Sequence, residues 1–273
     1  MADSLSSLIQ AVDAADSANG LLEAVQNLAA ARLEGAIPTL IAALSYNNPG
    51  AAVAAVDGLI QMGEAAVPPL LEQLDLHNYS ARAWAIRALA GIGDPRGLIT
   101  LLGVATADFA MSVRRAAAKG LGMMKWHWFP DNLLEIAQAE VLEALLFVAQ
   151  QDEEWIVRYS AVSGLQSLAD AIALTYPEWR SQINSQFEQM ASGDSSWTVR
   201  ARVWMAQQHL QATSAVQMLV CDAQPSPLSA TDWQMILDTL YDRKGQERMV
   251  FAEGDPRRYR ELAVSMAQTP DAI

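Results

Sequence analysis

One segment of this sequence reads Asn78-Tyr-Ser-Ala-Arg82-Ala-Trp-Ala-Ile-Arg87-Ala-Leu-Ala-Gly-Ile-Gly-Asp94. An earlier segment, Asn48-Pro-Gly to Met62-Gly-Glu64, has the same helical spacing of apolar residues and the same closing pair of a glycine and an acid. The two segments are 30 residues apart, counted from Asn48 to Asn78. A helical pattern that recurs at such a spacing is typical of stacked helical hairpins, whose neighbouring units bury one continuous core. The sequence therefore predicts an all-α fold, a curved solenoid of helical hairpins.

Later copies of the segment share an aspartate that is followed, six positions on, by an arginine with a valine before it. These pairs are Asp108 and Arg114, Asp152 and Arg158, and Asp194 and Arg200. Because a carboxylate is favourable at the positive end of a helix, we expect the aspartates to be N-caps or first-turn acids of the second helix in each hairpin. First helices are expected at 36–44 and 66–74, where prolines fit the first helical turn.

The composition agrees with closely packed helices. Hydrophobic residues make up 52% of the 273 residues but aromatic residues only 7%, so alanine and leucine supply most of the apolar surface. The formal net charge of −13 repels phosphate and anionic lipid, which argues against nucleic acid as a partner. The sequence starts without a signal-peptide pattern and has no uninterrupted stretch of about 18 apolar residues, so we expect no membrane insertion. The single cysteine, Cys221, cannot form an internal disulfide, which favours a reducing compartment, the cytoplasm or a plastid-like one.

The repeated arginine defines the register of the second helices. With the arginine as position zero and a turn of about 100° per residue, positions −1, +3, +4 and +7 are apolar in most copies and form the expected buried stripe. Position zero lies within the arc of this stripe. We therefore expect these arginines to be partly buried structural cations that pair with an aspartate or with carbonyl groups of an adjacent repeat. They are Arg82, Arg114, Arg158 and Arg200. Contact with a ligand is the alternative role.

Positions +1, +2 and +5 of the second helices lie opposite the stripe, on the side that a solenoid commonly offers as its concave binding surface. We call this side the free face. With Ala52 as the first zero position, its larger residues are Asp57, Trp84, Arg87, Arg115, Lys119, Tyr159 and Arg202. Cations and aromatic rings gathered on one face of an acidic protein predict a flat, anionic ligand or an acidic partner. The alternative is an ordinary solvated helix face.

Several of these segments resemble the E/F-type phycobilin lyases of cyanobacteria. The resemblance is carried by residues 46–58, 78–96, 113–122 and 157–165, and it covers roughly residues 5–211. It implies a HEAT-like helical-repeat solenoid that acts as a heterodimer, in which this chain is similar to the F-type subunit and the partner is an E-type subunit. It also implies that the heterodimer attaches phycocyanobilin through a thioether to a cysteine of the phycocyanin α subunit.

This resemblance gives the free face a chemical role. The reaction adds a thiol of the acceptor protein to an exocyclic ethylidene group of the bilin, so the lyase need not supply a nucleophile and Cys221 is not required. The lyase must instead hold the flexible bilin in one conformer and place a proton. No cofactor is expected, because the bilin is the transferred substrate.

The free-face residues fit the parts of a bilin. Its two propionates favour arginine or lysine, and its planar rings stack on aromatic side chains. The expected propionate ligands are Arg87, Arg115 and Lys119, and the expected stacking partners are Trp84 and Tyr159. The pyrrole N–H groups favour a carboxylate, so Asp57 is the expected catalytic residue, with a pyrrole-binding and proton-managing role.

Other functions stay open beside this one. A related subgroup isomerises the bilin during attachment and carries an Asn-His-Cys-Gln-Gly-Asn motif near the turn of the first repeat. This chain has Tyr46-Asn47-Asn48-Pro49-Gly50 there, so attachment without isomerisation is expected. A non-catalytic scaffold or chaperone for phycobiliprotein assembly or phycobilisome turnover is the alternative function, and a helical-repeat adaptor that binds no bilin is a further one.

An aromatic cluster at residues 125–130, Lys-Trp-His-Trp-Phe-Pro, interrupts the repeats. We expect it to fill an irregular joint between repeats; a lid over the bilin and a contact with the E-type subunit are the alternatives. The three histidines, His77, His127 and His209, lie in different repeats, so no metal site is expected.

The repeat pattern fades near residue 211, which predicts two parts of the chain. Residues 1–211 are the expected repeat domain, and residues 212–273 the expected linker and small C-terminal helical extension. Prolines and small polar residues at 221–229 read as the linker, and helices are expected over 232–241 and 256–266. We expect this extension to cap the last repeat; docking on an acidic partner and a frayed end are the alternatives.

Overall fold

The computed structural model describes residues 2–74, 78–214, 235–236 and 239 of the chain, and within them all regular structure is helical. The chain divides into two units, Met1–Pro227 and Leu228–Ile273. The helices discussed below belong to the first unit. The predicted boundary between residues 211 and 212 stays a prediction.

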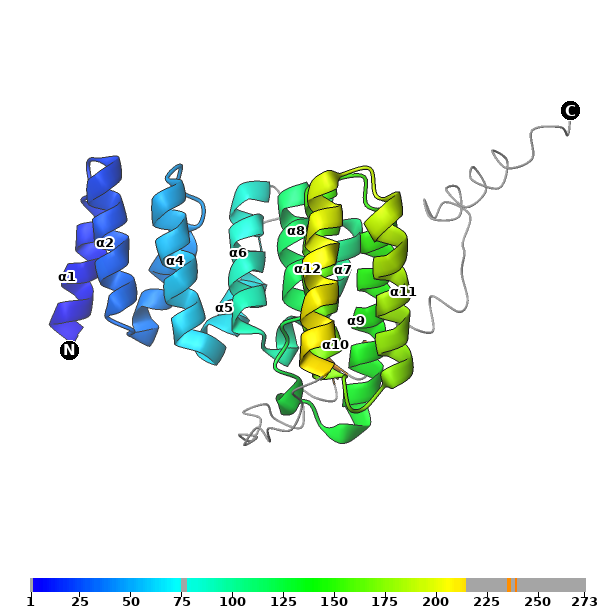
Figure 1. Ribbon diagram of the computed structural model, residues 1–273. Coiled ribbons are helices and arrows are strands. Elements are labelled where there is room, and N and C mark those ends of the chain that lie inside the picture. The colour runs from blue at the N-terminus through cyan, green and yellow to red at the C-terminus, as the bar shows by residue number, and fades with distance from the viewer. Residues whose placement is uncertain (1, 75–77, 215–234, 237–238, 240–273) are drawn as a thin grey trace, which may run out of the picture. The chain divides into compact units, whose positions relative to one another are not determined.

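The described part of the first unit, residues 2–74 and 78–214, consists of six helical hairpins (Figure 1). The first helices of the hairpins are α1 (Ala2–Asp13), α3 (Ile37–Ala43), α5 (Val67–Glu72), α7 (Leu98–Ala107), α9 (Asp131–Gln151) and α11 (Pro177–Gly193). The second helices are α2 (Ala18–Ala30), α4 (Pro49–Met62), α6 (Tyr79–Ile92), α8 (Met111–Leu121), α10 (Trp155–Ala171) and α12 (Trp197–Ser214). Short 3-10 helices lie between them: η1 (Glu34–Ala36), η2 (Gly63–Ala66), η3 (Pro95–Gly97) and η4 (Trp126–Trp128).

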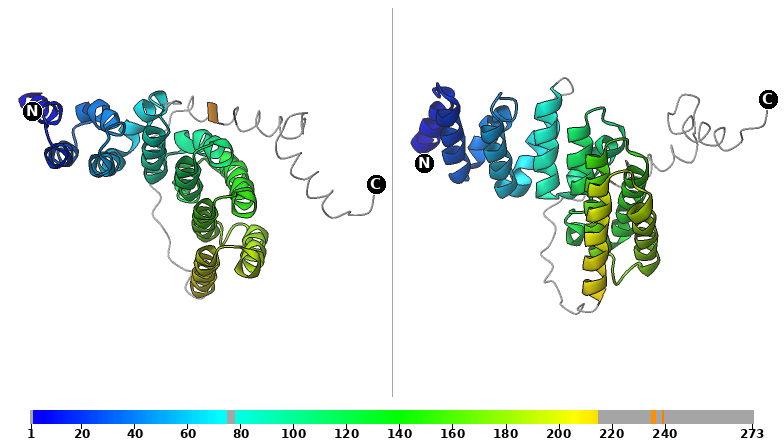
Figure 2. Two further views of the ribbon diagram at one scale, coloured as in Figure 1. Left: turned by 90° about the horizontal axis from the view of Figure 1, so that it is seen from above. Right: turned by 45° about the horizontal axis from the view of Figure 1, so that its top comes forward.

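The second helices form one continuous layer, in which each packs against the next from α2 to α12. Within this unit the hairpins follow an arc, and the second helices lie along its inner side (Figure 2, left). The predicted all-α solenoid of HEAT-like hairpins is therefore confirmed, and the free face of the second helices looks into the arc.

The predicted buried stripe of the second helices is also confirmed. In α8, Val113, Ala117, Ala118 and Leu121 are fully buried, and the corresponding residues of α10 are buried as well. The stripe begins less completely in α6, where Ala81 is only half-buried. Because these side chains are small, neighbouring helices can approach closely and leave few voids.

Two glycines allow the closest approach of helices in the row. A Cβ atom on Gly122, at the end of α8, would collide with the backbone of Gly164 in α10, and one on Gly164 would collide with the carbonyl oxygen of Ala118. The α8 and α10 backbones therefore touch at a point where no other residue type fits without a shift of a helix.

Helix starts and ends follow the expected local rules. Residues 36–44 and 66–74 begin as 3-10 turns and continue as α3 and α5, each with a proline in its first turn as predicted. The side-chain oxygens of Asn48 and Asn78 accept hydrogen bonds from the amides of Ala51 and Ala81, at 3.1 Å and 3.0 Å, and so cap α4 and α6. α6 ends at Gly93, which adopts the left-handed conformation with φ 68°.

The stretch Pro49–Glu72 is long and apolar enough, by length and composition, to cross a membrane. In the structure it comprises α4, η2 and α5, and the backbone turns at Gly63 with φ 66°. The stretch also includes Asp57 and Glu64. Its apolar residues contribute to the core between hairpins, which explains the high hydropathy.

The aromatic cluster at 125–130 packs at the joint between two repeats, as expected. The amide of Lys125 donates to the carbonyl of Gly93 at 2.8 Å and ties the cluster to the end of α6. Phe129 is buried, and the ring of Trp126 packs on it with a centroid distance of 5.4 Å. Trp128 lies under the ammonium group of Lys125 at 4.0 Å.

The predictions for the C-terminal part fall almost wholly outside the described residues. Cys221, the linker at 221–229, the helix at 256–266 and most of the helix at 232–241 lie there. Met235, Ile236 and Thr239 are described and helical, and the Thr239 hydroxyl donates to the carbonyl of Met235 at 2.8 Å.

Candidate functional site

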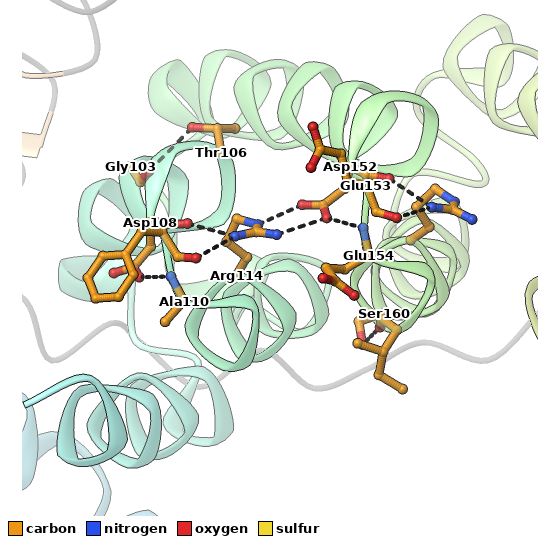
Figure 3. Close-up of polar contacts among 12 residues, drawn as sticks. Gly103, Thr106, Asp108, Ala110, Arg114, Asp152, Glu153, Glu154 and Ser160 are labelled. Atoms are coloured by element: carbon orange, nitrogen blue, oxygen red, sulfur yellow. Dashed lines mark hydrogen bonds and ion pairs between the residues drawn. The ribbon is translucent and has the colours of Figure 1, made fainter.

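A row of arginine–aspartate pairs connects three consecutive second helices to the turns of the hairpins that follow. Arg82 of α6 donates two hydrogen bonds to Asp108, at 2.7 Å and 3.1 Å. Arg114 of α8 binds Asp152 in the same way (Figure 3), and Arg158 of α10 binds Asp194. Each arginine therefore pairs with the aspartate of the next repeat, and the predicted structural role of these arginines is confirmed.

This row of arginine–aspartate pairs, which we call the arginine ladder, is reinforced by hydrogen bonds to the backbone. Nη1 of Arg114 donates to the carbonyls of Asp108 and Phe109, and Nη1 of Arg158 donates to those of Asp152 and Glu153 (Figure 3). Each of these arginines thus binds the turn of its own hairpin and the carboxylate of the next. Arg200, the last member, donates through Nε to the carbonyl of Asp194.

The aspartates are placed differently from the prediction that they would be N-caps or first-turn acids. Asp108 lies two residues before the N-cap of α8, Ala110, and its Oδ1 accepts the amide of Ala110 at 2.8 Å. Asp152 and Asp194 repeat this arrangement with the amides of Glu154 and Ser196. Each carboxylate accepts a hydrogen bond from a backbone amide and two from a guanidinium. For this reason it lies in the turn rather than at the start of the helix.

The pKa values of Asp194, Arg114 and Arg158 reflect these contacts. Burial opposes the charged form of Asp194, but hydrogen bonds from Arg158 and from the Ser196 amide outweigh it, so the pKa of Asp194 is below its ordinary value. The hydrogen bond to Asp152 raises the pKa of Arg114 above its usual value, and that to Asp194 does the same for Arg158. These shifts favour the ionised form of both groups in the Arg158–Asp194 pair.

The predicted free-face residues lie in one register on neighbouring helices, outside the buried stripe. Four are exposed and three are half-buried. The exposed residues are Asp57 of α4, Arg87 of α6, and Arg115 and Lys119 of α8. The half-buried residues are Trp84 of α6, Tyr159 of α10 and Arg202 of α12. Since neighbouring helices pack about 8–10 Å apart, the row from α4 to α10 is about 24–30 Å wide, and a ligand that touches both ends must be extended.

The cations of the free face differ from those of the ladder in having no acidic partner. Within residues 2–74 and 78–214, Arg87, Arg115 and Lys119 form no ion pair. The Arg87 guanidinium lies over the Trp84 ring, 5.5 Å from its centroid. Asp57 has no hydrogen-bond partner in the same ranges. The face therefore offers unpaired charge beside aromatic rings, which suits a planar ligand with carboxylates.

The register also locates residues that the sequence analysis did not single out. Position −3 of four second helices holds a large exposed apolar side chain, and the same register arithmetic would have found them: Tyr79, Met111, Trp155 and Trp197. The ring of Trp197 covers the guanidinium of Arg200 at 4.7 Å, and that of Phe109 covers Arg82 at 5.2 Å. Some of these rings thus shield the arginine ladder from solvent.

Among the described residues, no group of three or more histidine, cysteine or acidic side chains is arranged to hold a metal ion. His209 donates or accepts through Nε2 at 2.8 Å from Asp170, which links α12 to α10. His127 lies in the aromatic cluster.

Comparisons with known proteins agree with this architecture. A family model for HEAT repeats matches residues 67–166. The phycocyanobilin lyase subunit beta of Pseudanabaena tenuis is 65% identical over 280 residues, covering 98% of this chain and 99% of the relative. The phycocyanin alpha phycocyanobilin lyase CpcF of Synechocystis is 57% identical over 162 residues, covering 59% of this chain and 75% of the relative.

A solved structure is similar as well. A chain in the complex of CpcE and CpcF of phycocyanin lyase from Nostoc sp. PCC7120 is 49% identical, with a TM-score of 0.58. The match covers 63% of this chain and 98% of that chain. Together with the near full-length match to the Pseudanabaena relative, this means that the chain belongs to the family of phycocyanobilin lyase subunits, of the E/F type with HEAT-like repeats.

Proposed function

We propose that this chain is the F-type subunit of a heterodimeric phycocyanobilin lyase, which attaches phycocyanobilin through a thioether to a cysteine of the phycocyanin α subunit. The names of the Pseudanabaena and Synechocystis relatives support the reaction and the acceptor, and the CpcE–CpcF complex supports an E-type partner. The structural observation that carries the proposal is the set of cations on the inner side of the arc that have no acidic partner among residues 2–74 and 78–214.

In this reaction the lyase itself forms no covalent bond to the bilin. The acceptor sulfur forms a bond to the ethylidene carbon of the bilin, and the thiol proton ends on the adjacent ring carbon, so nothing is oxidised and no group leaves. The acceptor supplies the nucleophile. The lyase contributes by holding bilin and thiol in one geometry and by placing a proton. No cofactor besides the transferred bilin is needed for this balance.

The free-face residues take named roles in the proposal. Arg87, Arg115 and Lys119 bind the propionates, and Trp84 and Tyr159 stack on the pyrrole rings. The exposed carboxylate of Asp57 accepts hydrogen bonds from pyrrole N–H groups and holds the proton that moves during addition. The reaction requires a reduced acceptor thiol, which supports the cytoplasm as its location.

The test is reconstitution of the attachment. The chain is co-expressed with an E-type partner, a source of phycocyanobilin and the phycocyanin α subunit, and covalent bilin on the acceptor is detected by zinc-induced fluorescence after denaturing electrophoresis. A lyase yields a fluorescent acceptor only when both subunits are present. A scaffold or chaperone would change the amount or assembly of the acceptor without changing the bilin bound per acceptor.

Variants test the assigned roles in the same assay. We expect Asp57→Asn to lower the rate of attachment and Arg87→Ala to weaken bilin binding, while Cys221→Ser leaves both unchanged. Wild-type binding and transfer by both Asp57→Asn and Arg87→Ala would refute the assignment of these residues.

A further inference from the structure

Arg202 lies at the junction of α10 and α12, where its guanidinium is held by neutral groups. Nε donates to the hydroxyl of Ser163 at 3.0 Å, and Nη2 donates to the side-chain oxygen of Gln166 at 2.8 Å. The guanidinium also lies over the ring of Tyr159, 5.9 Å from its centroid. Although Arg202 belongs to α12, its charge therefore lies over α10.

This half-buried cation has no counter-ion among residues 2–74 and 78–214. Asp170, an acid of α10, is engaged by His209 of α12 at 2.8 Å. Burial without a compensating carboxylate lowers the pKa of Arg202 below its ordinary value, whereas Arg114 and Arg158 of the ladder show the opposite shift. In a protein of net charge −13, a desolvated and unpaired arginine is costly unless something else neutralises it.

The neutral contacts fix the orientation of this cation. The Ser163 hydroxyl donates to the carbonyl of Tyr159 at 3.3 Å and so turns its lone pairs toward Arg202. A guanidinium has five N–H donors, and Ser163 and Gln166 use two of them. The remaining donors form a fork of the kind that binds one carboxylate through both oxygens.

The position of the fork suits a ligand of the free face. Because the charge of Arg202 lies over α10, it is one helix away from α8, which carries Arg115 and Lys119. At about 8–10 Å between helices, two carboxylates of one small molecule can reach both places. The half-buried Tyr159 also lies on α10, with its ring centroid 5.9 Å from the Arg202 guanidinium.

From this arrangement we infer that Arg202 is a carboxylate anchor of the bilin site, binding one propionate while the cations of α6 and α8, Arg87, Arg115 and Lys119, bind the other. This inference deepens the proposed function and rests on it. Arg202 is a positioning residue, because it holds the substrate and takes no part in forming the C–S bond.

The experiment compares phycocyanobilin with its dimethyl ester, whose propionates carry no charge. Affinities of both ligands for the purified heterodimer are measured by visible absorption titration, for wild type and for Arg202→Gln. We expect Arg202→Gln to reduce the ratio of acid affinity to ester affinity by about tenfold to hundredfold, because a charge-assisted pair is lost only with the acid. Affinity for the ester stays near that of wild type.

Two further variants serve as controls for this experiment. Arg32→Gln is the matched control. Arg32 also donates to a glutamine, Gln61, at 3.1 Å, but it is exposed and lies near the other end of the row. The ratio of acid affinity to ester affinity in this variant is expected to equal that of wild type. Arg202→Lys keeps the charge without the planar fork and is expected to retain an intermediate ratio. A ratio unchanged by Arg202→Gln, or an equal loss of affinity for acid and ester, would overturn the inference. Failure of the wild-type heterodimer to bind either ligand would overturn the proposed function and this inference with it.

Discussion

Arg114 binds Asp152 across 38 residues of sequence through two parallel hydrogen bonds, Nε to Oδ2 at 2.7 Å and Nη2 to Oδ1 at 3.0 Å. The two side chains are 15% and 7% exposed, so the pair is largely removed from water. Because Arg114 also binds two carbonyls of its own turn, it fixes the angle between consecutive hairpins as well as their contact. The shape of the inner face therefore depends on this ladder of arginine–aspartate pairs.

Removing the arginine of this pair is expected to destabilise the fold. Arg114→Met leaves the Asp152 carboxylate buried without its cation, and the loss in free energy of unfolding should be about 3 kcal/mol. Urea unfolding followed by circular dichroism measures it. Arg115→Met is the control, because the adjacent Arg115 is exposed and forms no ion pair within the described ranges; its effect should stay within about 0.5 kcal/mol. Equal losses in the two variants would contradict a structural ladder.

The ladder also predicts how stability depends on pH. The folded-state pKa of Asp194 lies below the ordinary value of about 3.9, so its ionised form stabilises the fold above that value. This stabilisation is lost as the pH falls through the lowered pKa. Asp194→Asn should therefore be less stable than wild type at neutral pH, and the difference between the two proteins should shrink toward pH values of about 3. Urea unfolding at several pH values measures the difference. A difference that is constant with pH would show that the carboxylate charge contributes nothing.

Much of the fold was predictable because one residue type sets a register. The arginine at position zero, spaced against alanines and leucines, is enough to locate the buried stripe and the free face. The position of the aspartates was not predictable, since sequence spacing does not distinguish a helix cap from a turn residue two positions earlier. That difference depends on the preceding repeat, whose arginine binds the same carboxylate.

The site was predictable only in part. Residues such as Arg87 and Lys119 follow from the register of a single helix. The contacts of Arg202 depend on side chains of α10 that reach across to α12, and no periodicity within one helix encodes which of them meet. The same holds for Gly122 and Gly164, whose approach depends on the packing of two helices.

Exposed cations on the free face predict a salt-dependent affinity. Replacing Arg87, Arg115 and Lys119 together by glutamine should leave the free energy of unfolding within about 1 kcal/mol of wild type, because none of the three is paired within the described ranges. The heterodimer should bind phycocyanobilin more weakly as salt rises from about 0.05 M to about 0.5 M, since screening shortens the reach of exposed charges. The triple variant should bind weakly at both concentrations and show a smaller salt dependence. If the triple variant showed the same salt dependence as wild type, these cations would not belong to the binding site.

Close contact between α8 and α10 predicts opposite effects for two substitutions of the same kind. Gly122→Ala places a methyl group against the backbone of Gly164, so a helix must shift; the expected loss is about 1–3 kcal/mol of unfolding free energy, as for other overpacked sites. Gly103 lies inside α7 and has nothing within 4 Å of a built Cβ, so Gly103→Ala should instead gain about 0.5–1 kcal/mol from the better helix propensity of alanine. Thermal and urea unfolding of the two variants measure the pair. Because α8 carries Arg115 and Lys119, a shift of this helix in Gly122→Ala should also weaken bilin binding, whereas Gly103→Ala should not. Stabilisation by both substitutions would mean that α8 and α10 are farther apart in solution than the structure has them, and the spacing assumed for the two propionates would then be wrong as well.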